Sequence, residues 1–458
     1  MVRESLTAAA GRVALLLLVA GGKVVSAHDH DGSDVPEGEV VSPEPLDSIL
    51  WWHICTMIVA FGILFPIGMV LGIVRSRWHV PVQVVATVVA TTGWFLGHAH
   101  KGRQFSHNIH ATFAPVLMMM LVTQIGLGIY LKLHLERGIH GRIRRVAVVL
   151  HGIVGKAMPV MSWIQMLFGG ITALGFCRAD HLGQCLAHFI MGSSFIAYGI
   201  ILTMMLLVGQ GWLRRSGRSQ EFWDSLVISI WGCINTFTEH RWGTGWNHSD
   251  IQHTSMGVVW WCAGLLGLWL SRSKDGQPRR NVIPAIVIFL TGWAMSGHAQ
   301  HLPLSTMVHA VFGYTLMAAG ASRVIEICFV LQDKPTRDEP SSFQHLTPFL
   351  LFASGFIFMS ATEEQLALID SVGIDHVSYL LVLYSLAFLL YLLVQVLLHI
   401  FVANAPEAKP AYNPISLENG HSREAEEQRA RETDEFELAG LITDDEDADS
   451  DSDGPRKP

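Results

Sequence analysis

The stretch from Pro45 to Gln83, PLDSILWWHICTMIVAFGILFPIGMVLGIVRSRWHVPVQ, contains two apolar runs, and each run carries a histidine near its start. The first run continues from Ile49 to Val74 without an Asp, Glu, Lys or Arg. An α-helix needs about 20 apolar residues to cross the hydrocarbon core of a bilayer, so this run predicts a membrane span. His53 and His79 then raise a question, because an imidazole within a span serves either as a hydrogen-bonding residue or as a ligand.

The composition of the whole chain extends this prediction. Of its 458 residues, 50% are hydrophobic and only 15% are charged, which is typical of a membrane protein with several spans. Apolar windows predict about eleven spans, at 48–74, 79–98, 109–131, 146–174, 187–209, 222–238, 254–271, 281–298, 304–331, 346–362 and 377–402. We therefore expect an all-α, polytopic membrane protein that does not bind nucleic acid.

The distribution of basic residues predicts the orientation of these spans. Short cytoplasmic loops are enriched in Lys and Arg. With the N-terminus outside, every predicted inner loop is basic, with clusters at 75–77, 132–145, 214–218, 272–280 and 334–337. The N-terminus is then luminal or extracellular and the C-terminus cytoplasmic, in the endoplasmic reticulum, Golgi, vacuole or plasma membrane.

The chain is expected to have five parts. Arg3 and Arg12 precede the apolar VALLLLVAGG, and small residues end at Ala27, so 1–27 is predicted to be a signal peptide, with an uncleaved anchor as the alternative. A short luminal segment (28–44), two transmembrane domains (45–216 and 217–402) and an acidic, disordered cytoplasmic tail (403–458) follow. Cys177 and Cys185 fall in one outer loop, where an oxidising compartment permits a disulfide.

Four histidines of the first half lie near the ends of successive spans. Under the predicted topology, His53 and His110 lie toward the outer surface on the first and third spans, whereas His79 and His151 lie toward the cytoplasm on the second and fourth. A four-helix bundle can bind a cofactor with side chains from facing helices. The depths therefore predict two bis-histidine haem b sites, His53 with His110 and His79 with His151; structural hydrogen bonding is the alternative for each residue.

The motifs around these histidines resemble the cytochrome b-561 family. The first span has His53, then Pro66-Ile67-Gly68 and Arg75. The second has His79 with Gln83, then Gly93 and Gly97. The third has His110 with Gln124, and the fourth has His151 with Gly155. The resemblance covers about residues 45–210 and implies a four-helix haem core with one accessory helix, whose His188 is taken as structural.

Two features depart from that family. Ala114 stands where the family has a glycine four residues after its third histidine, and no extracellular electron-donating domain of the DOMON type precedes the core. The whole arrangement, from the N-terminal segment to six further spans and an acidic tail, resembles the fungal YTP-type integral membrane proteins.

The second half places acidic and imidazole side chains at the outer ends of its spans. This half loosely resembles the transmembrane protein 45 family, which has similar histidine-rich helix ends. Histidine together with carboxylate suits zinc, iron or manganese, so an outer divalent or ferric metal site is one interpretation. Structural hydrogen bonding and a role in proton transfer or haem binding are the alternatives. The candidate ligands are Glu239, His253, His298, His301 and Glu364.

Three functional hypotheses follow. The first is transmembrane electron transfer through two b-type haems, from a cytoplasmic reductant such as ascorbate to an outer acceptor such as a metal ion; the chain would then be an oxidoreductase of the cytochrome b-561 type. The second is a transporter or metal-handling protein without redox chemistry. The third is a structural or trafficking protein with a degenerate haem scaffold. The lipid bilayer is a partner in all three, and a homodimer is an open alternative.

Overall fold

The structure, a computed structural model, describes residues 35–36, 39–135, 137–178, 181–240, 243–297, 301–331 and 340–404. The predicted signal peptide, the tail from residue 405 onward and His298 lie outside this range. Over the described residues the chain is helical, without strands and with two isolated β-bridges. The all-α class is thereby confirmed.

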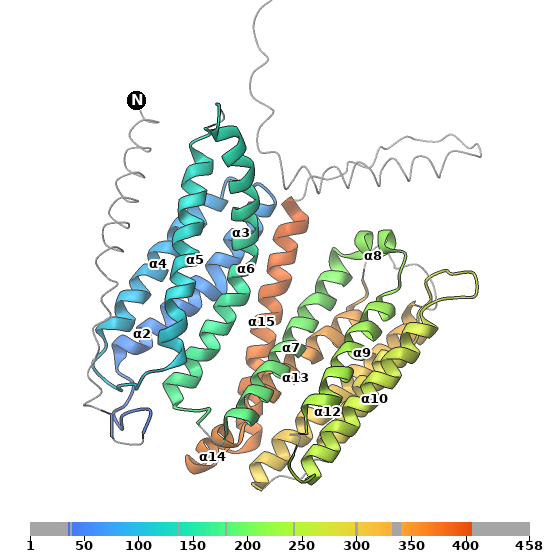
Figure 1. The fold of residues 1–458 in the computed structure, drawn as a ribbon. Coiled ribbons are helices and arrows are strands. Elements are labelled where there is room, and N and C mark those ends of the chain that lie inside the picture. Colours follow the sequence, from blue (N-terminus) through green and yellow to red (C-terminus); the bar gives the residue numbers. More distant parts are fainter. Residues whose placement is uncertain are drawn as a thin grey trace, which may run out of the picture. The chain divides into compact units, whose positions relative to one another are not determined.

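The described residues divide at Gly175 into two compact units, and each is considered by itself (Figure 1). The sequence predicted this boundary near Gly217, two helices later. Helix α7 (Leu182–Leu207) packs in the second unit against α13 (Leu346–Met359). The reason is a close crossing: a Cβ added to Gly192 of α7 would lie 2.7 Å from the carbonyl oxygen of Gly355 on α13.

The first unit consists of two helical hairpins. The first hairpin joins α2 (Ser48–Met57), the π-helical η2 (Ile58–Leu64) and α3 (Phe65–Ile73) to α4 (His79–Ala99). The second joins α5 (Ile109–Lys132) to α6 (His140–Leu174). In Figure 1, α2 and α3 run beside α4, and α5 runs beside α6.

A small apolar core connects the two hairpins midway along their helices. It is formed by residues of η2, α3, α4, α5 and α6, namely Ala60, Phe61, Phe65, Ala86, Ala90, Leu117, Leu121 and Met158. Each of the four predicted ligand histidines lies seven residues, or about 10 Å of helix, before a member of this core. The core therefore lies between His53 and His110 on one side and His79 and His151 on the other.

The second unit contains the remaining helices. After α7 come α8 (Gln210–Ser216), α9 (Gln220–Thr238), α10 (His248–Leu270), α11 (Ile283–Ser296), α12 (Pro303–Ile325), the π-helical η4 (Glu326–Leu331), the 3₁₀ turn η5 (Ser342–His345), α13, α14 (Glu363–Ser371) and α15 (His376–Asn404). Helices α12 and α13 lie at its centre, because their side chains are the most completely buried. Tyr384 of α15 shares a 2.6 Å hydrogen bond with Thr315 of α12.

Each of the eleven predicted spans corresponds to a helix, but not all are equally apolar. Among the described residues, eight helices are long and apolar enough to cross a membrane, and α11 is apolar but shorter. Helices α9 and α10 fall outside this set. Helix α9 begins with the buried carboxylates Glu221 and Asp224, and these charges lower its apolar character.

A buried ion cluster connects α9 to α12. Glu221 is 1% exposed, and its Oε1 accepts from Arg323 at 2.9 Å and from Arg280 at 3.2 Å. Arg323 also reaches Glu326 at 2.7 Å, and Asp224 lies buried one turn after Glu221. A charge in a low-dielectric interior is stable only when it is paired. This cluster is therefore a structural requirement for the helices that carry it.

The loop before α7 in the second unit contains the disulfide that the sequence permits, since Cys177 and Cys185 are bonded. The bond connects the segment before α7 to the first turns of that helix. Glu364 at the start of α14 accepts a hydrogen bond from the backbone N–H of Cys177 at 2.6 Å. The loop is thus held both to α7 and to α14.

The close crossing of α7 and α13 predicts that Gly192→Leu destabilises the second unit. Overpacking of this kind costs about 1–3 kcal/mol, because backbones or side chains must shift. We expect a lower thermal midpoint for the purified protein in detergent. Gly183→Leu on the same helix is the matched control, since an added Cβ there meets nothing within 4 Å. Equal midpoints for the two variants would contradict the assigned crossing.

The ion cluster predicts that Arg323→Gln lowers the free energy of unfolding by about 3–5 kcal/mol, because it leaves buried carboxylates without their shared cation. The exposed Arg279 provides the control, since Arg279→Gln removes the same charge outside the cluster. Thermal unfolding of both variants in detergent measures the difference. A loss of stability no greater in Arg323→Gln than in Arg279→Gln would show that the cluster is not required.

Candidate functional site

The four histidines of the first unit form two pairs. The ring centres of His53 and His110 are 6.2 Å apart, and their planes cross at 84°. Those of His79 and His151 are also 6.2 Å apart, with an interplanar angle of 90°. Each pair joins the first hairpin to the second, in the combinations that the sequence predicted.

Hydrogen bonds to backbone carbonyls orient three of these imidazoles. The Nδ1–H of His53 donates to the Gly93 oxygen at 2.7 Å, that of His79 to the Gly68 oxygen at 2.7 Å, and that of His110 to the Gln165 oxygen at 3.2 Å. A neutral imidazole that donates from Nδ1 keeps its lone pair on Nε2. In metal-binding histidines, the ring nitrogen that does not bind the metal commonly donates such a hydrogen bond, which determines the tautomer and the ring orientation.

The same local arrangement repeats at each histidine of the first hairpin. His53 donates to Gly93 and lies against Gly97, where an added Cβ would be 2.6 Å from its Nδ1. His79 donates to Gly68 and lies against Gly72, where an added Cβ would be 2.8 Å from its Nδ1. A side chain larger than hydrogen at either second glycine would displace the ring.

In the second hairpin, Gln165 and Gln124 occupy the positions that Gly93 and Gly68 have in the first hairpin. Gln165 donates from Nε2 to the carbonyl oxygen of His110, and Gln124 does the same for His151, both at 3.0 Å. Four residues after each glutamine comes a glycine beside the ring: a Cβ on Gly169 would be 3.2 Å from His110, and one on Gly128 would be 3.4 Å from His151. The four imidazoles thus have related surroundings.

The pair geometry fits two axial ligands of one metal. An imidazole nitrogen binds a transition metal at about 2.0–2.1 Å and lies about 1.1 Å from its ring centre, so two imidazoles on opposite sides of one metal have ring centres about 6.3 Å apart. Both observed separations are 6.2 Å. The donor set of neutral histidine nitrogens also suits haem iron.

The two pairs are separated along the bundle. The carbonyl of Gly93 on α4 accepts the hydrogen bond from His53. His79 lies on the same helix, 14 residues before Gly93, so the two pairs are about 21 Å apart along the helix. The hydrocarbon core of a bilayer is about 30 Å thick. The two pairs can therefore both lie within one membrane, on opposite sides of its midplane.

The loop between α4 and α5 is held to the start of α2 by hydrogen bonds. Asp47 caps α2 through Leu50 and accepts from the backbone N–H of Lys101 at 2.9 Å. The Lys101 and Leu50 backbone donors hold the pKa of the Asp47 carboxyl below its usual range. Arg103 donates to the carbonyl oxygens of Glu44 and Ala173. These contacts order the loop near the His53 pair.

The predicted outer metal ligands of the second unit are only partly brought together. His253 and Glu239 form an ion pair at 3.5 Å, both side chains being 30% exposed. Glu364 contacts the disulfide loop, His301 is exposed, and His298 lies outside the described residues. Across the described part of the chain, no group of three or more His, Cys, Asp or Glu side chains could hold a metal ion.

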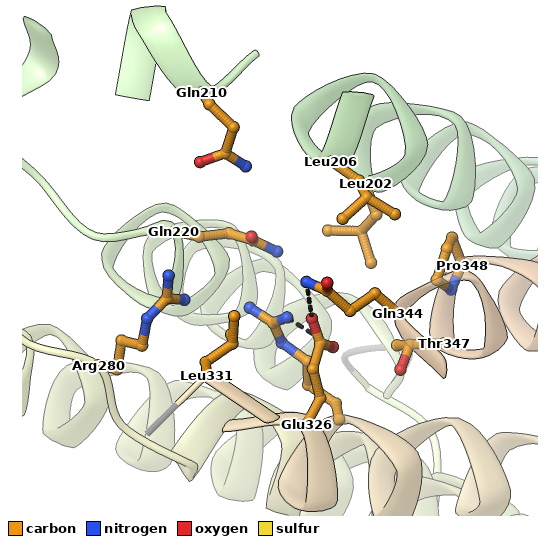
Figure 2. A pocket seen from close by; sticks show the side chains of 11 residues that line it. Leu202, Leu206, Gln210, Gln220, Arg280, Glu326, Leu331, Gln344, Thr347 and Pro348 are labelled. Atoms are coloured by element: carbon orange, nitrogen blue, oxygen red, sulfur yellow. Dashed lines mark hydrogen bonds and ion pairs between the residues drawn. The ribbon is translucent and has the colours of Figure 1, made fainter. Parts of the chain in front are cut away.

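Sequence reasoning missed the pocket that adjoins the ion cluster. It has a volume of about 390 Å³, including open space, and Gln344 donates to Glu326 at 3.1 Å on its wall. Figure 2 shows Gln344 pointing to Glu326, with Gln220 and Arg280 across the space. The charged residues within or near apolar helices could have indicated this pocket in the sequence.

The sequence analysis also missed Gln165 and Gly169, which contact His110. Their four-residue spacing on the fourth span could have indicated that both face this histidine.

Comparison with known proteins extends over most of the chain. Residues 161–401 match the family described as Protein YTP1-like, C-terminal, and residues 33–134 match a domain of unknown function, DUF2427. No solved structure matches.

Three curated relatives are similar to parts of the chain. Protein YTP1 of Saccharomyces cerevisiae is 47% identical over 260 residues, which cover 56% of this chain and 55% of that protein. The uncharacterized membrane protein C3B8.06 of Schizosaccharomyces pombe is 22% identical over 74% of this chain and 90% of its own length, and the uncharacterized membrane protein YCR061W of S. cerevisiae is 26% identical over 44% and 40%. The chain thus spans about half the length of Protein YTP1. Since the YTP1-like family matches more than half of the residues and the helices are those of a membrane protein, this chain is an integral membrane protein that belongs to the YTP1-like family.

Proposed function

We propose that the first unit is a transmembrane electron conduit in which His53 with His110 and His79 with His151 hold two b-type haems. The observation that carries this proposal is the 6.2 Å separation of the rings in both pairs, close to the spacing of two axial imidazoles. Structural histidines joined by a direct N–H···N hydrogen bond would have closer ring centres, about 5 Å apart when the bond is in line.

The surroundings of the histidines support ligation. The carbonyls of Gly93, Gly68 and Gln165 each accept an Nδ1–H, which leaves Nε2 as the basic nitrogen of His53, His79 and His110. At His151, the Gln124 amide lies 3.5 Å from Nε2, too long for a strong hydrogen bond. The glycines opposite the rings let the helix backbones come close enough for these contacts.

The chemistry would be the movement of single electrons. Haem iron with two histidine ligands supplies reversible one-electron transfer and has no open position for oxygen. The two histidine pairs lie on opposite sides of the apolar core of the bundle, so they would provide one site for each leaflet.

Charge at the inner ends supports a direction from the cytoplasm outward. Arg75, Lys132 and Arg145 belong to the basic clusters that the positive-inside rule assigns to the cytoplasm. The same cations would attract a small anionic reductant such as ascorbate. A luminal or extracellular metal ion such as ferric iron would be the acceptor, in a membrane of the secretory pathway.

Absorption spectroscopy of the purified full-length protein tests this proposal. We expect a b-type α band in the reduced-minus-oxidised spectrum and two haems per chain. His110→Ala should lose the outer haem and His79→Ala the inner one, because each removes one axial ligand. The double variant His110→Ala with His79→Ala should lose both.

The matched control is His98→Ala. His98 is exposed and donates to the Trp94 carbonyl of its own helix, so its removal should leave the spectrum unchanged. Helical circular dichroism of every variant verifies the fold. Absence of a b-type band from the wild-type protein, expressed with sufficient haem, would overturn the redox proposal. If that protein instead contains stoichiometric zinc or iron, and the Glu239→Gln variant does not, the result would favour metal handling.

A further inference from the structure

The ion cluster of the second unit contains one carboxylate more than it has cations. Among the described residues, its members are the carboxylates of Glu221, Asp224 and Glu326 and the guanidiniums of Arg280 and Arg323. The three acidic residues are all more than nine-tenths buried, at 1%, 7% and 3% exposure. With every group ionised, the cluster would therefore hold one uncompensated negative charge away from water.

The ion pairs of the cluster leave Asp224 as the carboxylate in excess. Glu221 accepts from both arginines, and Glu326 lies 2.7 Å from Arg323. Within the part of the chain that the structure describes, neither arginine forms an ion pair with Asp224. Two carboxylates and two guanidiniums thus neutralise one another, and the charge of an ionised Asp224 would remain.

The hydrogen bond of Asp224 comes from an uncharged side chain. Tyr198 on α7 shares a side-chain hydrogen bond with Asp224 across to α9. A phenol hydroxyl can donate to a carboxylate, and its oxygen can accept from a carboxylic acid. This contact is therefore compatible with both protonation states of Asp224, but it supplies no positive charge.

The surroundings of Asp224 favour its neutral form. The ionisable groups near it are Glu221 on its own helix, Tyr198 on α7, Arg323 on α12, Glu326 on η4 and Arg280 before α11. Arg323 attracts the Asp224 carboxylate, whereas Glu221 and Glu326 repel it. The neighbouring side chains of α11 and α13 carry no charge, since they are Pro284, Ala285, Ile288, Thr347 and Leu351. A buried carboxylate without a cation of its own takes up a proton, because burial penalises the charged form.

Two adjoining pockets give Asp224 a route to water. The first is the pocket of Figure 2, with Gln220, Arg280, Glu326 and Gln344 on its wall. The second has a volume of about 360 Å³, including open space, and its wall includes Tyr198, Asp224 and Arg323. Leu202, Arg323 and Thr347 line both pockets, so the two spaces meet at these side chains. Water in these spaces can exchange a proton with the Asp224 carboxyl.

We propose that Asp224 is a proton-binding site of the second unit, which exchanges its proton with water in the two pockets beside Arg323. In the uptake step a hydronium ion gives its proton to one carboxylate oxygen of Asp224, which leaves a neutral carboxylic acid and a water molecule. The cluster then changes from one net negative charge to none. Ionisable residues inside membrane domains commonly belong to proton pathways, so this site supports proton-coupled transport by the second unit. The assignment does not depend on haem in the first unit.

Infrared spectroscopy of the purified full-length protein tests the proposal. A protonated carboxyl group has a C=O stretching band that ionised carboxylates lack. We expect this band in the wild type at neutral pH, where solvent-exposed Asp and Glu side chains are ionised. Isotope labelling of aspartate at its side-chain carboxyl carbon should shift the band, which assigns it to aspartate without any substitution. The band should also shift in heavy water, because the acid proton exchanges through the pockets.

Two variants and a matched control complete the test. Asp224→Asn should abolish the band, whereas Asp370→Asn should retain it, since Asp370 is an exposed carboxylate of the same unit. Glu326→Gln is the decisive variant, because it leaves two carboxylates with two arginines. Asp224 should then ionise, and the band should disappear although the residue is still present.

Helical circular dichroism of each variant verifies the fold. A wild-type spectrum without an aspartate acid band at neutral pH would overturn the assignment. The same conclusion would follow from a band that persists in Asp224→Asn or in Glu326→Gln. A band that does not shift in heavy water would contradict proton exchange through the pockets.

Discussion

A neutral imidazole inside a bilayer has one proton and one lone pair to satisfy, and the arrangement of the first unit depends on how this chain does so. At His53, His79 and His110, an Nδ1–H donates to a backbone carbonyl of a neighbouring helix. A carbonyl within a helix already accepts a hydrogen bond from the N–H four residues later, so an imidazole of another helix must reach its second lone pair from beside the helix. That approach requires a close neighbour, and the small residues around the rings provide it.

In the first unit this requirement explains the glycines. Gly93 and Gly97 form one contact surface for His53, and Gly68 and Gly72 form another for His79. The π-helical η2 lies between the His53 turn and the Gly68 surface of the same span. A π-helical turn changes the angular register of the residues that follow it. The two ends of one span can thereby present a histidine and a histidine-accepting surface, respectively, to the same neighbouring helix.

The second unit solves a different problem, because it buries full charges. Glu221 lies on α9, which falls outside the set of apolar helices, and its pairing with Arg323 compensates the cost of burying its charge. Close glycine crossings serve both units. In the second, Gly192 and Gly355 bring α7 to α13, and Gly292 and Gly313 do the same for α11 and α12. Lipid offers little hydrophobic drive for helix association, so close packing and polar contacts have to provide it.

The sequence by itself determined the order of the long helices, the all-α class, and the expectation that His53 lies near His110 and His79 near His151. These features depend on local hydrophobicity, on loop charge and on depth in the membrane, all of which can be counted along the chain. Only the tertiary structure decided that α7 belongs with α13 and that Glu221 shares two arginines. Such contacts join residues more than fifty positions apart or depend on which side of a helix a small residue occupies. Several packings of the same apolar helices satisfy the sequence pattern, and only side-chain fit in three dimensions distinguishes them.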